Sequence, residues 1–205
     1  AQSGMVMALE EIVELKSDKV PSDLLKRIYH QITVGCDYLV MLRAEAEKRG
    51  HPKGAMSHDL HGHEDDIVPS DAVKAVVALA RAVKLLPDTY SEKKAAYKET
   101  ALLTMNWLTN KATPMGDYGF SRFQRGMPED TPIPKNEWQT RYLVMYCQAC
   151  IDLFKLGELK YRDMAVTTVE EIMQRQISQE NNESGFYGHF YEFPSLNFSE
   201  KSWAH

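Results

Sequence analysis

The densest group of metal-binding side-chain types lies between Ser57 and Asp66. His58, His61 and His63 are spaced as HxxHxH, and Asp65 follows two residues later. Imidazole nitrogens and carboxylate oxygens are the ligands that zinc and similar divalent ions take from proteins. Three interpretations stay open: a metal site, part of a substrate rim, and a solvated acidic loop. We favour the solvated loop and therefore predict no metal and no cofactor.

A second stretch with chemical potential runs from Gly185 to Phe193. It combines aromatic and polar groups, and its candidate substrate-binding residues are Tyr187, His189 and Tyr191. Aromatic faces stack on sugar rings, and polar neighbours orient the hydroxyl groups. Glu192 is the candidate catalytic acid, but glycoside hydrolysis requires two carboxyl groups. The alternative interpretation is an aromatic loop that plugs the rim of the fold.

A third stretch, residues 116–126, mixes glycine, aromatic and charged residues. Its candidate substrate-binding residues are Asp117, Tyr118 and Arg122, and Trp138 joins them where the chain re-enters a helix. Carboxylate and guanidinium groups hydrogen-bond sugar hydroxyls, whereas the aromatic rings can equally fold inward as a small separate core.

All of these segments fall in the long stretches that follow the second helix of each predicted pair. Apolar residues at helical spacing, bounded by Gly, Pro and capping residues, predict six helices. The predicted helices span residues 5–16, 22–49, 72–86, 92–111, 137–156 and 158–179, with Ser91 and Asn136 as caps. Short and long connections alternate, so antiparallel neighbours place every long connection on one rim. We predict an all-α fold in which antiparallel helix hairpins form an α/α toroid or an arc of one, with residues 1–205 as a single domain.

The composition excludes several classes of function. The 205 residues carry a net charge of −5 without a basic stripe, so no nucleic-acid partner is expected. No apolar run reaches the length that spans a membrane. Cys36, Cys147 and Cys150 lie within helical patterns and are interpreted as buried thiols, since the CxxC pair lacks a second pair.

Several helix motifs resemble those of the (α/α)6-barrel, or six-hairpin, glycosidases, and glycoside hydrolase family 9 in particular. The resemblance rests on the Ala-rich helix that starts at Pro69, the Trp107-Leu108 helix end, Asn136-Glu137-Trp138, and the Gly157-to-Tyr161 step. It implies a carbohydrate-active protein, a secreted or periplasmic location, and hydrolysis of a polysaccharide or oligosaccharide by acid and base carboxylates.

The chain also departs from that family. A closed barrel of this type has twelve helices, whereas six are predicted here, and the Asp-Ala-Gly-Asp motif of the family does not occur. No catalytic residue is therefore carried over. We expect the chain to be part of a larger catalytic domain, with a partner chain or missing segments completing the toroid. The alternatives are a non-catalytic helical scaffold that binds glycan or protein through its rim, and a metal-dependent hydrolase that uses the His58–Asp66 loop.

Overall fold

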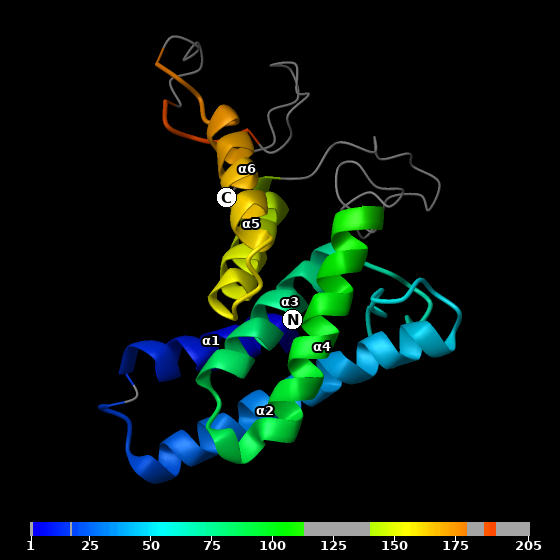
Figure 1. Ribbon diagram of the computed structural model, residues 1–205, viewed down its shortest axis with the longest axis vertical. Helices are drawn as coiled ribbons and strands as arrows, with labels where there is room; N and C mark the ends of the chain where they lie inside the picture. Colours follow the sequence, from blue (N-terminus) through cyan, green and yellow to red (C-terminus); the bar gives the residue numbers. More distant parts are fainter. Residues whose placement is uncertain (1, 17, 113–139, 180–186, 192–205) are drawn as a thin grey trace.

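The computed structural model describes residues 2–16, 18–112, 140–179 and 187–191. Every regular element within these residues is helical, and the helices form three hairpins (Figure 1). In chain order they are α1 (Gln2–Lys16), α2 (Ser22–Lys48), α3 (Pro69–Leu85), the 3-10 turn η1 (Asp88–Tyr90), α4 (Ser91–Trp107), the π-helical turn η2 (Leu108–Ala112), α5 (Thr140–Lys155) and α6 (Tyr161–Gln174). The predicted all-α fold is confirmed, and its closure into a toroid stays a prediction.

The three hairpins stack in chain order around α3. This helix packs against α1 on one side and α5 on the other, and it also contacts α2 and α4. Helices α1, α3 and α5 form what we call the first layer. Helices α2 and α4 pack together in a second layer, and α6 packs on α5. Figure 1 shows α1 and α2 at one end of the stack and α5 and α6 at the other.

The composition of α3 explains its central place. The helix is built mainly from Ala and Val, and most of its positions are buried. Small side chains let neighbouring helices approach closely on several sides, while alanine favours the helical backbone. Helix α3 therefore packs closely against neighbours on several sides. The three cysteines are buried free thiols, as predicted.

The connection between α2 and α3, residues 49–68, is fastened to the ends of the helices. The Ser57 N–H donates to the Leu42 carbonyl at 3.2 Å, and the Ser57 hydroxyl donates to the Glu64 carbonyl at 2.6 Å. Gly54 has φ +95°, and a Cβ atom there would lie 2.2 Å from the Leu103 carbonyl oxygen of α4. Only glycine allows this close approach of backbone to backbone.

Helix α6 is shorter than the predicted span 158–179. Gly157 has φ +92°, and the helix begins only at Tyr161. At its other end the chain leaves the helix because Ile177 donates its N–H to the His189 carbonyl at 2.7 Å. The prediction ran too long because no Gly or Pro interrupts residues 158–179. Other helix starts also moved: α1 begins at Gln2 and α3 at Pro69, and Ser91 is the first residue of α4 without a capping hydrogen bond.

Candidate functional site

The segment 187–191 is held against α5 and α6 by its backbone. Residues Gln176 and Phe190 form an antiparallel bridge, and the Tyr191 N–H donates to the Arg175 carbonyl at 2.8 Å. The Thr140 hydroxyl, at the first residue of α5, donates to the Tyr191 carbonyl. These hydrogen bonds give the segment a defined backbone although it contains no regular strand among its described residues.

The predicted substrate-binding side chains of this segment differ in exposure. Tyr187 is 62% exposed, His189 is exposed, and Tyr191 is half-buried. An inward-facing plug would bury the aromatic rings, so the exposure of Tyr187 favours a contact surface. Asp117, Tyr118, Arg122, Trp138 and Glu192 lie outside the described residues.

The histidine-rich loop forms pairs of imidazole and carboxylate. His58 Nδ1 lies 2.8 Å from Asp71 Oδ2, and His63 Nδ1 lies 2.9 Å from Asp66 Oδ2. The two rings stand edge to face, with centroids 5.9 Å apart. Asp65 instead pairs with Arg49 at 2.9 Å. The four predicted ligand candidates therefore do not converge, and no group of three or more His, Cys, Asp or Glu side chains within the described ranges is arranged to hold a metal ion.

His61 contributes its backbone to a tight turn. The Asp59 carboxylate accepts the N–H groups of His61 and His63, at 2.8 and 3.2 Å. These hydrogen bonds, the His61 one foremost, lower the pKa of Asp59. The carboxylate thus stays ionised and stabilises the turn.

The most unusual electrostatic feature was missed by the sequence analysis and lies inside the first layer. Glu10 of α1 is fully buried, and both of its carboxyl oxygens are without a hydrogen-bond partner among the described residues. Beside it Arg81 of α3 donates to Asp152 of α5, with Nε 3.0 Å from Oδ2, and Gln148 donates to the same oxygen at 2.9 Å. Asp152 is only 5% exposed. We call Glu10, Arg81 and Asp152 the buried charge cluster.

Burial raises the pKa of Glu10 to about 9, although the positive charge of Arg81 opposes the shift. The negative charges of Asp152 and Glu14 raise the pKa of Glu10 further. Removing a carboxylate from water destabilises the charged form unless donors replace the water, and here none does. At neutral pH Glu10 is therefore protonated, while Asp152 has the Arg81 guanidinium as its partner.

The buried charge cluster could have been suspected from the sequence. Glu10 stands between Val6 and Val13, four residues after one and three before the other, on the face of α1 that the apolar pattern buries. A carboxyl group on a buried face needs a partner or a proton. Perturbed buried carboxyl groups often mark functional sites, but Glu10 and Asp152 are buried here and neither carboxyl group is open to a dissolved substrate.

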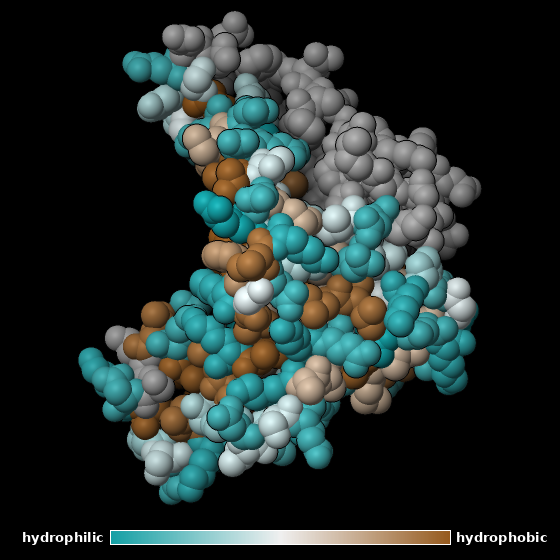
Figure 2. Space-filling view, in the orientation of Figure 1, coloured by the Kyte–Doolittle hydropathy of each residue, from teal (hydrophilic) through white to brown (hydrophobic). Residues whose placement is uncertain are grey.

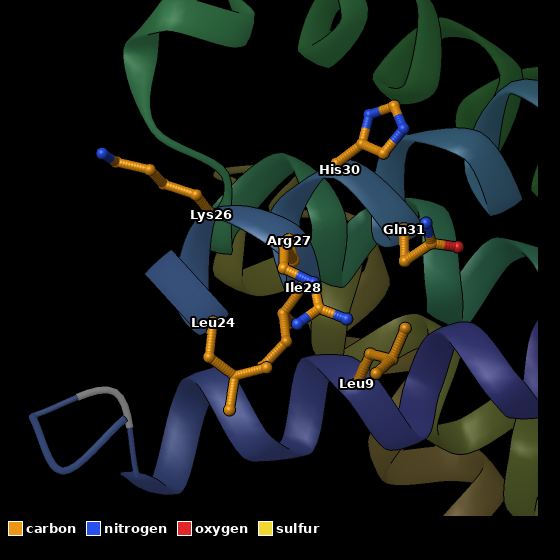
Figure 3. A pocket seen from close by; sticks show the side chains of 7 residues that line it. All are labelled: Leu9, Leu24, Lys26, Arg27, Ile28, His30 and Gln31. Carbon is orange, nitrogen blue, oxygen red and sulfur yellow. The ribbon is translucent and has the colours of Figure 1, made fainter. Parts of the chain in front are cut away.

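A cleft of about 560 Å³ lies between α1 and α2, on the side away from α3 (Figure 3). Leu9, Leu24 and Ile28 form its apolar floor, and the Arg27 side chain extends toward α1.

Comparison with protein-family models, curated proteins and solved structures found no match for this chain. None of the described helices is long and apolar enough to cross a membrane.

Proposed function

We propose that this chain is a carbohydrate-active α-hairpin domain that holds an oligosaccharide on segment 187–191, beside the first residue of α5 and the last residues of α6. The observation that carries the proposal is the exposed Tyr187 ring on a segment whose backbone is tied down. The Gly188 N–H donates to the Ile177 carbonyl at 3.1 Å, directly beside Tyr187. A ring that is presented on a fixed backbone loses little conformational entropy when a sugar stacks on it.

His189 is exposed two residues from Tyr187 and supplies a nitrogen suited to a sugar hydroxyl. Tyr191, half-buried and anchored through Thr140, extends the aromatic surface toward α5. Stacking supplies affinity, and the polar group fixes the orientation of the sugar. The resemblance to six-hairpin glycosidases independently favours a carbohydrate ligand.

We extend the proposal to glycoside hydrolysis on the strength of that resemblance. Hydrolysis requires two carboxyl groups that flank the glycosidic bond. Glu10 and Asp152 are buried inside the first layer, so they do not serve as that pair. The binding and the hydrolysis proposals are therefore separable, and each has its own assay.

Binding is tested by calorimetric titration of soluble oligosaccharides of differing sugar and linkage into the wild-type protein. Tyr187→Ala is expected to weaken binding roughly tenfold, since an aromatic contact contributes about 1.5 kcal/mol. Tyr187→Phe keeps the ring and serves as the matched control, with affinity close to wild type. The melting temperature should change little in both variants because the side chain is exposed. Absence of binding across the panel, or equal binding by Tyr187→Ala and wild type, would refute the proposal.

Hydrolysis is tested by release of reducing ends from the same oligosaccharides and from the matching polysaccharides. Turnover that survives Glu10→Gln is the expected outcome if the domain is catalytic. Binding without turnover would favour the non-catalytic glycan-binding scaffold.

A further inference from the structure

The exposed large apolar side chains are distributed unevenly over the stack. Within the described residues, all of them except Tyr187 belong to the two terminal hairpins, and none belongs to α3 or α4. They are Met5, Ile12, Leu15, Leu24, Val34 and Met41 at one end, and Val144, Phe154, Leu159, Val166, Val169 and Met173 at the other. Figure 2 shows the corresponding brown surface over both terminal hairpins. The central hairpin of α3 and α4, which has a hairpin on each side, exposes none of these large apolar side chains.

The first end of the stack, which we call the α1–α2 edge, carries an ordered apolar stripe. Met5, Ala8, Ile12 and Leu15 follow one another at intervals of three, four and three residues, so they lie on one face of α1. The residues of α1 that contact α3 lie on a different face, because Glu10 and Glu14 face Arg81 and Lys84. The 560 Å³ cleft of Figure 3 runs beside this stripe.

The opposite end, which we call the α5–α6 edge, has the same organisation. Val166, Val169 and Met173 repeat at three and four residues on α6 and are all exposed. A groove of about 340 Å³ lies between them and α5, with Ile151 and Phe154 on its α5 side. Tyr161 is buried where α6 packs on α5, and Ala165 borders both that contact and the groove.

We propose that the α5–α6 edge of one copy packs on the α1–α2 edge of a second copy, head to tail. Inside the chain α1 packs on α3, α2 packs on α4 and α3 packs on α5, so stacking of one hairpin on the next already occurs. Stacked repeats need polar outer faces on their terminal units to remain soluble alone, and here both terminal faces are apolar. A second copy supplies the next hairpin that each edge lacks.

The charges beside the two edges are complementary in this arrangement. With α6 of one copy against α2 of the next, Glu170 meets the side of α2 that carries Arg27. Neither residue has a hydrogen-bond or ion-pair partner among the described residues. Opposite charges around an apolar centre set the register and the partner.

The contact joins two different surfaces, so it is heterologous. Such contacts close into a ring if the rotation between copies allows, and they otherwise propagate as an open chain. Two copies that close on each other would satisfy both edges of each.

The test uses light scattering and sedimentation over a range of concentrations. The wild type is expected to be a dimer or a larger ring. Ile12→Glu breaks the α1–α2 edge and Val169→Glu breaks the α5–α6 edge, and each is expected to weaken association at least roughly 100-fold because a buried unpaired charge costs several kcal/mol. Thr167→Glu, on the exposed polar side of α6, is the control and should remain associated.

Mixing the two broken variants decides the head-to-tail geometry. Val169→Glu retains an intact α1–α2 edge and Ile12→Glu retains an intact α5–α6 edge, so an equal mixture should form a dimer of one copy of each. An independent pair, Arg27→Glu and Glu170→Arg, should each weaken association and should restore it when mixed. Helical circular dichroism and melting temperatures equal to those of Thr167→Glu establish that each variant is folded.

A monomeric wild type at the highest concentration overturns the proposal. So does a single edge variant that associates as well as the wild type, since the two copies would then meet through identical edges. Failure of the mixture to form the mixed dimer, with both variants folded, overturns it as well. The result is independent of glycan binding, because Tyr187 belongs to neither edge.

Discussion

Replacing Glu10 by glutamine should stabilise the protein at neutral pH and remove a specific pH dependence. The pKa of Glu10 is about 9 in the folded protein, against an ordinary value of 4.5 for a glutamate in water. Between these values the folded state holds a proton that the unfolded state has released. Folding stability is therefore full below pH 4.5 and falls as the pH rises toward 9, by about 1.4 kcal/mol per pH unit. Glutamine has nearly the same shape as the protonated acid and does not titrate.

The size of the effect follows from the same numbers. The ordinary pKa of 4.5 lies 2.5 pH units below pH 7, so keeping Glu10 protonated in the folded state costs about 3 kcal/mol at pH 7. Glu10→Gln should be more stable than wild type by up to that amount at pH 7. The difference should shrink to less than about 1 kcal/mol at pH 5. Urea unfolding at pH 5, 6, 7 and 8, followed by circular dichroism, measures the free energy of unfolding directly.

Glu11→Gln is the matched control for this experiment. It lies next in the same helix but is exposed, so its substitution should change stability by the same small amount at each pH. A Glu10→Gln variant that is less stable than wild type by a constant amount would refute the reasoning. That result would mean that Glu10 is ionised and paired in the folded protein.

Three further predictions concern other parts of the structure. Arg81→Met should destabilise the fold by up to about 3–5 kcal/mol because it leaves the buried Asp152 carboxylate with only Lys155, 3.6 Å away, as a cation among the described residues. Adding Asp152→Asn should recover at least part of the loss, and urea unfolding of both variants checks this. Gly54→Ala should lower the free energy of unfolding by about 1–3 kcal/mol, since φ is positive and the new Cβ meets the Leu103 carbonyl; an unchanged unfolding midpoint would contradict it. Zinc should bind only weakly and His61→Ala should not alter that binding, so calorimetry that shows tight, stoichiometric uptake abolished by His61→Ala would contradict it.

The helices could be predicted because each pattern is local. Apolar spacing locates α2 and α5, and the Ala and Val content of α3 indicates close packing on several sides. The end of α6 could not be predicted, because it depends on a backbone hydrogen bond from Ile177 to His189. Nothing in the sequence near Ile177 or His189 indicates that these two residues pair.

The residues of the candidate site also differ in whether the sequence alone could predict them. Tyr187 and His189 could be suggested because aromatic and polar residues cluster in one connection. The pairing of Arg81 with Asp152 could not, since it joins residues 71 positions apart on two helices. Of the buried charge cluster, only Glu10 could be suspected from the sequence, because it lies among apolar positions of α1 that are expected to be buried. The position of a buried charge in the sequence does not indicate which residue lies beside it in the fold.

Helix α6 packs chiefly against α5, whereas α3 contacts four other helices. Each hairpin of this stack is therefore stabilised mainly by its neighbours in the chain, and the last hairpin has only one neighbour. Unfolding of such an array is graded, because a terminal unit can open while the others remain folded. Backbone amides of α6 should consequently exchange with solvent deuterium well before those of α3, and the order of exchange should follow the position of each hairpin in the stack.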